Sequence, residues 1–160
     1  MFFTKIYPKF YKKIQTEKIK KILKKANPSG RILDVGAGCG FLERFVDTIA
    51  VDIDKEQMKS INKKCLASGD FLPFKKESFD CVFCLDTVHL LKTTKELFRV
   101  LKPKGKLIVS IFCNEHNFKT KSNWLKQKLK PKKILNESRK EAEKLGIKFT
   151  VLATGGRTTY

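Results

Sequence analysis

The fold of this chain is decided by one stretch, Ile32-Leu33-Asp34-Val35-Gly36-Ala37-Gly38-Cys39-Gly40. Its first four residues form the apolar pattern of a short buried strand, and the glycines that follow end that strand. Glycine lets a backbone approach a ligand closely and adopt torsions that other residues avoid. The spacing is GxGxG, so the third glycine of the GxGxxG pattern for NAD(P) is missing. The stretch therefore indicates a ligand-binding loop between a strand and a helix.

Strand and helix patterns alternate outward from this loop. Helices are expected over 41–46, 55–64 and 93–101, and a Ser-x-x-Glu capping box predicts another over 138–145. This alternation predicts an α/β fold with a Rossmann-like, doubly wound, mostly parallel sheet of about seven strands and helices on both faces. The expected strands are 31–35, 49–53, 65–67, 79–85, 106–112, 147–152 and 157–160.

Acidic residues follow two of the predicted strands. Asp52 ends the second strand, where a carboxylate can accept both ribose hydroxyls of a nucleoside while Ile53 lies on the adenine. Asp70 follows the third strand and could accept a hydrogen bond from the adenine amino group. Asp52 and Asp54 could also be ordinary helix N-caps. Because ligands bind beyond the carboxyl ends of parallel strands, these side chains are expected near the glycine loop.

Four segments, in order and suitably spaced, resemble the class I S-adenosylmethionine-dependent methyltransferases, and most closely the subset called methyltransferase type 11. They are ILDVGAGCGFL at 32–42, VDID at 51–54, GDFLPFKKESFDCVF at 69–83 and RVLKPKGKLIVS at 99–110. The resemblance implies S-adenosylmethionine as cofactor, with S-adenosylhomocysteine as product. It also implies an S-adenosylmethionine-dependent methyltransferase activity, but no particular acceptor.

The resemblance further implies a set of cofactor-binding residues. Asp34 and the glycine loop would hold the methionine part, with Asp34 near its ammonium group. Asp52 would bind the ribose, and Asp70 would contact the adenine amino group. The full set is Asp34, Gly36, Ala37, Gly38, Gly40, Asp52, Ile53, Asp70, Phe71 and Leu85.

A single domain over 1–160 is expected, because this length suits one hydrophobic core. We divide it into a basic N-terminal helix with its cap (1–30, helix about 10–26), a cofactor-binding core (31–112), a lysine-rich insertion (113–135) and a final helix with strands (136–160). No apolar run approaches the roughly 20 residues of a membrane span, and the first residues are too short a run for a signal peptide. A cytoplasmic protein is therefore expected.

The five cysteines are scattered through apolar segments, which favours buried thiols over disulfides. Cys81 and Cys84 have CxxC spacing but share a predicted strand, so their side chains should point to opposite faces. No His and Cys cluster has zinc-ligand spacing, and we expect no metal.

Methyl transfer from a sulfonium is a direct displacement, which needs a base only if the acceptor must first lose a proton. Asp86 and His89, just past the fourth strand, are the candidates for that base. A solvated aspartate and a packed histidine are the alternatives, and the catalytic residues stay unassigned. Cys84 lacks the proline neighbour of RNA cytosine methyltransferases and is not assigned as a nucleophile.

The acceptor is left open between a small molecule, RNA (tRNA included) and a protein. The net charge is +19, from 35 Lys and Arg against 16 Asp and Glu, and such a charge attracts polyanions. The basic N-terminal helix and the lysine-rich insertion would then contact RNA. A general lysine preference, as in heat-adapted organisms, explains the charge equally well. A non-catalytic, cofactor-binding partner subunit and an NAD(P) oxidoreductase are further alternatives, and oligomeric state leaves no signal.

Overall fold

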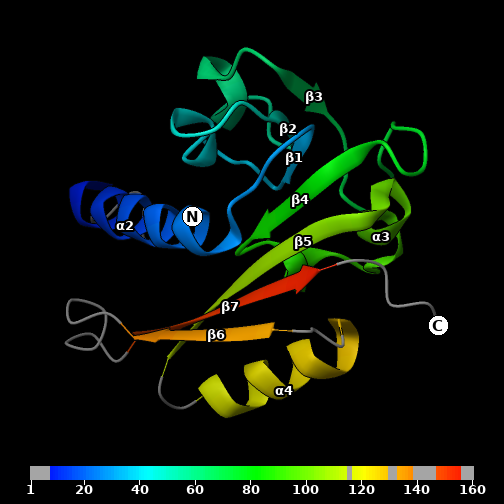
Figure 1. Ribbon diagram of the computed structural model, residues 1–160. Helices are drawn as coiled ribbons and strands as arrows, with labels where there is room; N and C mark the ends of the chain where they lie inside the picture. Colours follow the sequence, from blue (N-terminus) through cyan, green and yellow to red (C-terminus); the bar gives the residue numbers. More distant parts are fainter. Residues whose placement is uncertain (1–7, 115–116, 130–132, 139–146, 156–160) are drawn as a thin grey trace.

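A computed structural model describes residues 8–114, 117–129, 133–138 and 147–155. Its centre is a seven-stranded sheet with the order β3-β2-β1-β4-β5-β7-β6 (Figure 1). The strands are β1 (Ile32–Val35), β2 (Ile49–Asp52), β3 (Lys64–Leu66), β4 (Phe79–Leu85), β5 (Leu101–Asn114), β6 (Lys133–Ser138) and β7 (Ile147–Gly155). The predicted α/β class and the doubly wound order are confirmed. Six of the seven strands were predicted, and β6 is the strand that was not.

Parallel pairing joins β3, β2, β1, β4 and β5, whereas β7 runs antiparallel to both β5 and β6. The strand order reverses between β1 and β4, because the chain winds from β1 to β3 in one direction and continues from β4 in the other. Such a switch point leaves a crevice beyond the carboxyl ends of the strands.

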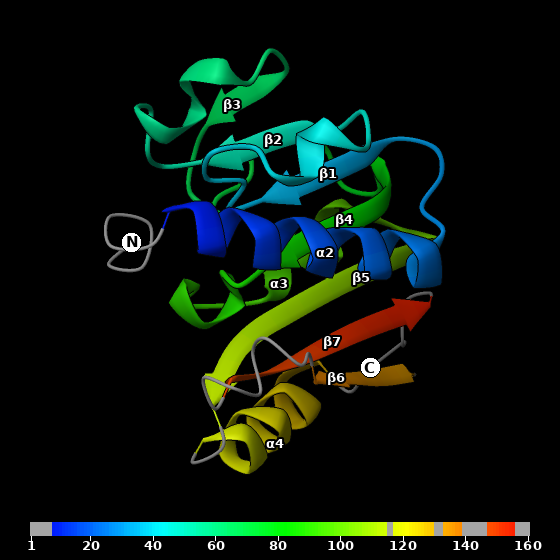
Figure 2. The ribbon, with the colours of Figure 1, turned by 90° about the vertical axis from the view of Figure 1, so that its left-hand side faces the viewer.

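Helices cover both faces of the sheet. On one face lies α2 (Pro8–Ala26), which crosses in front of the central strands in Figure 2 and packs Ile19 and Ile22 against Phe83 and Ile108. On the other face lie α3 (Lys95–Val100) and α4 (Phe118–Leu129), whose Leu97 and Leu125 join the larger apolar cluster. No helix in the described part of the chain is long and apolar enough to cross a membrane.

The strand β4 places its two cysteines on opposite faces, as predicted. Cys81 packs in the cluster under α2, and Cys84 in the cluster on the other face. A register irregularity between Phe79 and Cys81 allows Phe79 to pack on the same side as Val82 and Cys84. Both thiols are buried.

Two predicted helices are wrong in type. Residues 41–46 and 55–64 form only short 3₁₀ turns, η1 (Leu42–Arg44) and η2 (Gln57–Ser60). The second cannot continue, because Lys64 already pairs with Ala50 in the sheet. The third predicted helix, 93–101, is confirmed in a shorter form, 95–100, because Leu101 pairs with Phe79 in the sheet. The same pairing makes β5 begin earlier than predicted. A further 3₁₀ turn, η3 (Val88–Leu90), follows β4.

The predicted lysine-rich insertion contains regular structure that the sequence reading missed. Helix α4 fills its middle and β6 begins at its end. Ser138, predicted to cap a helix, ends β6 instead, and the rest of that helix lies outside the described residues. The sixth predicted strand extends to Gly155 because β7 pairs with β5 as far as Lys106. The predicted strand 157–160 also lies outside the described residues.

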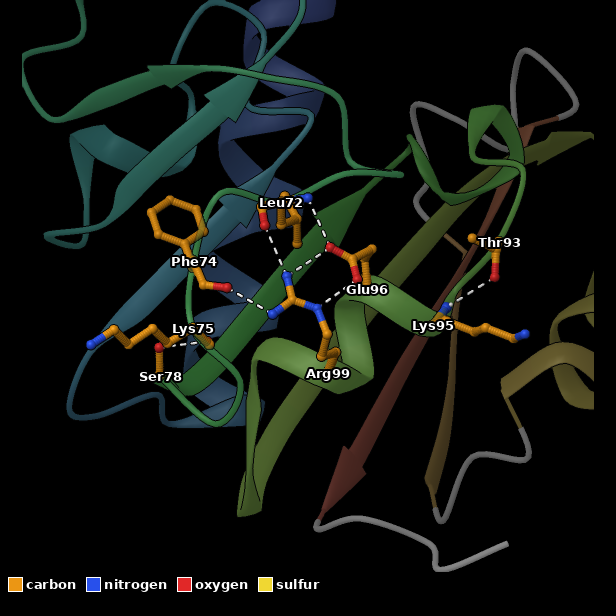
Figure 3. Close-up of polar contacts among 8 residues, drawn as sticks. All are labelled: Leu72, Phe74, Lys75, Ser78, Thr93, Lys95, Glu96 and Arg99. Carbon is orange, nitrogen blue, oxygen red and sulfur yellow. Dashed lines mark hydrogen bonds and ion pairs between the residues drawn. The ribbon is translucent and has the colours of Figure 1, made fainter.

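Arg99 of α3 fixes the loop that precedes β4 (Figure 3). Its guanidinium donates to the carbonyl oxygens of Leu72 at 2.8 Å and Phe74 at 2.7 Å. It also pairs with Glu96, whose carboxylate accepts the backbone N–H of Leu72 at 2.9 Å. The planar fork of arginine can serve several acceptors at once, which a lysine ammonium cannot do in this geometry.

We predict that Arg99→Met destabilises the protein by roughly 2 kcal/mol, which lowers the melting temperature by about 4–8 °C. The loss follows from two carbonyl oxygens left without their charged donor. Thermal unfolding followed by circular dichroism measures it. Lys95→Met, an exposed change on the same helix, is the control. Equal melting temperatures for the two variants would contradict the structural role of Arg99.

Candidate cofactor site

A cavity of about 630 Å³ opens at the carboxyl ends of β1, β2 and β4, at the switch point of the sheet. It is lined by eight of the ten predicted cofactor residues. Gly40 and Phe71 do not line it, and of the two candidate bases only Asp86 does. The eight are Asp34, Gly36, Ala37, Gly38, Asp52, Ile53, Asp70 and Leu85.

The glycine loop turns at the end of β1 and is held to β2. The N–H groups of Gly36 and Ala37 both donate to the carbonyl oxygen of Val51, at 2.8 and 3.1 Å. Gly36 has φ +79°, and a Cβ there would lie 2.2 Å from Thr87 Oγ1 and 2.6 Å from Thr87 Cβ. Glycine is therefore required at position 36 by both backbone torsion and space.

Asp52 closes the same loop from β2. Its Oδ2 accepts the N–H of Gly38 at 2.8 Å, and its Oδ1 accepts the N–H of Asp54 at 2.9 Å. Asp54 in turn accepts the backbone N–H groups of Glu56 and Gln57, so the alternative capping role describes Asp54 well. Hydrogen bonds from Gln57 lower the pKa of Asp54. Each oxygen of Asp52 still has a second lone pair directed to other donors.

Asp70 joins the two loops on the other side of the cavity. Its Oδ1 accepts the N–H groups of Lys92 at 2.9 Å and Thr93 at 3.2 Å. Next to it, Phe71 is 78% exposed and is not part of the cavity lining. Ile53 is 75% exposed but lies on the cavity wall, so it forms part of the rim.

Asp34 is the most buried acidic group of the cavity, with 3% exposure. Its Oδ1, like Glu43 Oε2, is buried and has no hydrogen-bond donor among the described residues. Burial raises the pKa of Asp34 well above its usual value, and the neighbouring carboxyl of Glu43 raises it further. Asp34 is thus a buried acceptor that lacks a partner.

Asp86 is held by an ion pair with Lys18, a residue of α2 that is 1% exposed. Its carboxylate also accepts Ser110 Oγ at 2.9 Å and Gln15 Nε2 at 3.3 Å. Burial alone would raise the pKa of Asp86. The charge of Lys18 and the hydrogen bonds from Lys18, Ser110 and Gln15 outweigh burial, so the pKa is lowered overall. Asp86 therefore stays ionised, which weakens it as a proton acceptor at neutral pH.

His89 is exposed and lies outside the cavity lining. Partial burial and the charge of Lys121 lower the pKa of His89, while Asp86 opposes that shift.

The charge of the cavity is opposite to that of the chain. Six acidic residues line it, against one basic residue, Lys55, within the described part of the chain. No group of His, Cys, Asp or Glu among the described residues is arranged to hold a metal ion. The acidic side chains are Asp34, Asp52, Asp54, Glu56, Asp70 and Asp86.

Sequence reasoning missed the contribution of α2 and of Glu43. Gln15 and Ile19 line the cavity from α2, and Lys18 supports it from behind. A signal existed for Lys18, since it lies between Ile14, Ile19 and Ile22 on the helix face that is buried. A lysine on an apolar helix face usually needs a buried partner. For Glu43 the sequence offers no such signal, because the turn that carries it looked like a plain helix.

Residues 33–109 match the family described as a methyltransferase domain. The fold agrees: a possible histamine N-methyltransferase of Thermotoga maritima, described as SAM-dependent, superposes with a TM-score of 0.73. That likeness covers 97% of both chains at 17% identity, so it concerns the fold alone. The sequence of residues 33–109 thus matches a methyltransferase-domain family, and the fold of the chain is similar to that of a SAM-dependent methyltransferase.

Two curated relatives extend the comparison. An uncharacterised protein of Methanocaldococcus jannaschii is 35% identical over 68% of this chain and 53% of its own length. The demethylmenaquinone methyltransferase of Renibacterium salmoninarum is 36% identical over 56% of this chain and 44% of its own length. The chain spans about half the length of the curated relatives it matches.

We predict that Gly36→Ala destabilises the protein by more than about 3 kcal/mol, because it combines a left-handed torsion with a clash against Thr87. Gly38→Ala is the matched control. Gly38 also has a positive φ, of +55°, but the nearest atom to its Cβ is Gln57 Oε1 at 3.4 Å. That variant should lose only about 1 kcal/mol. Urea unfolding compares the two, and equal losses would refute the steric argument.

Lys18→Met should destabilise the protein by about 3–5 kcal/mol, because it leaves Asp86 buried without its cation. Lys24→Met, on the exposed face of α2, should change stability by less than about 0.5 kcal/mol. Since its pKa is lowered in the folded state, Asp86 stabilises the protein above its ordinary pKa and loses this effect as the pH falls through the lowered value. The deficit of Lys18→Met in urea unfolding should therefore shrink in acid, and a constant deficit would contradict the ion pair.

Proposed function

We propose that this chain transfers a methyl group from S-adenosylmethionine to a small-molecule acceptor. The observation that carries the proposal is the acidic cavity at the switch point, built around the unpartnered Asp34. A cofactor with a sulfonium and an ammonium group is attracted by buried carboxylates, whereas a dinucleotide with its phosphates is repelled.

The residues present fit this cofactor. Asp34 offers a buried oxygen without a donor, which suits the ammonium group of the methionine part. Asp52 would accept the ribose hydroxyls while its existing bonds keep the glycine loop in place. Asp70 would accept the adenine amino group, and Ile53 on the cavity wall would flank the ring, whereas Phe71 lies outside the lining. The remaining predicted residues, Gly36, Ala37, Gly38, Gly40 and Leu85, would provide close backbone approach and an apolar wall.

The cofactor supplies an electrophilic methyl group when bound. The chain's own contribution is then to orient the acceptor and to exclude water from the reacting atoms. Ile19 from α2 and Leu85 and Leu90 around the end of β4 form an apolar wall suited to both tasks. Asp86 would stay ionised and hold α2 rather than remove a proton, and His89 lies away from the wall.

One comparison favours a small acceptor. The demethylmenaquinone methyltransferase among the relatives is named for a small-molecule substrate.

RNA is the second candidate, on the evidence of exposed lysines on α2. Lys20 and Lys24 lie on the outer side of this helix, while Gln15 and Ile19 of the same helix line the cavity. A polyanion along α2 would therefore lie beside the site. Helix α4, the other lysine-rich element, covers the opposite face of the sheet, so one short RNA would not need both. Binding of RNA that weakens steeply with salt would favour this candidate.

We predict that purified protein binds S-adenosylmethionine and S-adenosylhomocysteine in a calorimeter and does not bind NADH. Asp52→Ala should weaken binding at least about tenfold, a loss of roughly 1.4 kcal/mol. Asp47→Ala removes an exposed aspartate outside the cavity and is the control. Failure of the folded protein to bind either sulfur ligand would refute the proposal.

Methyl transfer itself is tested next with labelled S-adenosylmethionine and two acceptor pools, a small-molecule extract and total RNA. Label in the first pool supports the small-molecule acceptor, and label only in RNA moves the proposal to the second candidate. Cofactor binding with no transfer to either pool would point to a non-catalytic partner subunit.

A further inference from the structure

Glu43 of η1 lies within hydrogen-bond contact of Asp34 of β1, behind the lining of the cavity. Asp34 is buried and Glu43 is half-buried, and the buried atoms Asp34 Oδ1 and Glu43 Oε2 have no donor from any described residue. The second oxygen of Glu43 accepts Thr48 Oγ1 at 2.6 Å. A buried acceptor without a partner is costly, and two adjacent ones need a common explanation.

A proton on either carboxyl supplies the missing hydrogen bond. Two carboxylates in hydrogen-bond contact cannot easily both ionise, and the pair then keeps one proton well above the usual acidic range. The other charges that face Asp34 are Asp52 from β2 and Lys18 from α2. Asp52 favours retention of the proton, and Lys18 opposes it while engaged with Asp86.

We propose that Asp34 and Glu43 share one proton in the ligand-free protein and release it when a cationic ammonium group binds at Asp34. Glu43 is then a positioning residue that makes cofactor binding depend on pH. The inference rests on the proposed function, since the ammonium belongs to the methionine part of the cofactor. The step balances: the shared O–H bond breaks, the proton passes to solvent, and the pair gains one negative charge opposite the bound cation.

The linkage has a definite sign. Below the pKa of the pair, binding must expel a proton, so affinity should rise about tenfold per pH unit and level off above that pKa. The same raised pKa makes Asp34 contribute to stability at low pH and lose that contribution as the pH rises through it.

The experiment titrates the whole protein with S-adenosylhomocysteine at several pH values between about 5 and 7, below the range in which an α-amino group titrates. Two buffers with different ionisation enthalpies report the protons released. We expect release of close to one proton at the acidic end. The second ligand is 5′-methylthioadenosine, which has the nucleoside but no ammonium, and it should bind without release. Release with both ligands, or with neither, overturns the proposal.

Glu43→Gln assigns the proton. The amide can donate to Asp34 without titrating, so release should vanish and affinity should become nearly independent of pH. Asp47→Asn removes an exposed carboxyl outside the cavity and should leave release unchanged. If Glu43→Gln does not fold, Thr48→Val replaces it: loss of the donor to Glu43 should move the release to higher pH. If the variant that folds releases the proton as the unaltered protein does, the role of Glu43 is overturned.

The two proposals fail separately. Absence of S-adenosylhomocysteine binding at every pH defeats the proposed function. Binding without proton release defeats only the shared proton and leaves the cofactor assignment intact.

Discussion

The crowding of carboxylates around one cavity is the constraint on which the rest of the site depends. Like charges at short range repel, so each must be compensated where it lies. Asp52 and Asp70 are compensated by backbone N–H groups, and Asp86 by Lys18 and Ser110. The bonds that neutralise these charges are the same bonds that join the loops to one another. Asp34 alone of these four lacks a donor at one buried oxygen, and this is where a cation fits.

Helix α2 is part of the site although it precedes the matched methyltransferase region. It supplies Gln15 and Ile19 to the cavity wall and anchors them through Lys18. Asp86 can meet Lys18 because its backbone turns into the left-handed region at φ +56°, directly after β4. Aspartate tolerates this conformation better than most residues. The ion pair therefore connects α2 to the turn at the end of β4, so that movement of α2 would alter the cavity.

The sequence predicted the sheet better than the helices. Strands showed as apolar runs, and the order of the motifs was enough for the topology and for ten cofactor residues, of which eight line the cavity. The predicted helices 41–46 and 55–64 are wrong. For 55–64 the reason is the pairing of Lys64 with Ala50 in the sheet, which overrides helix propensity and which no local pattern reveals. Helix α4 was missed because its lysines hid the apolar positions Leu125 and Leu129 that pack on the sheet. The exposure of Phe71 depends on the conformation of its loop, and the spacing of the sequence motifs does not predict that conformation.

The net charge of the chain and the charge of the cavity attract different ligands. Exposed lysines such as Lys20 and Lys24 on α2 are screened by solvent and act on extended polyanions. The carboxylates gather in the cavity at the carboxyl ends of the strands, and at Asp34, which is buried, a charge acts more strongly over a short distance than it does in water. A formal charge of +19 therefore says little about what enters the site. The charge of the cavity itself decides which ligand enters. A cation that enters exchanges its hydration for carboxylates that are already in place, whereas an anion would be repelled by them.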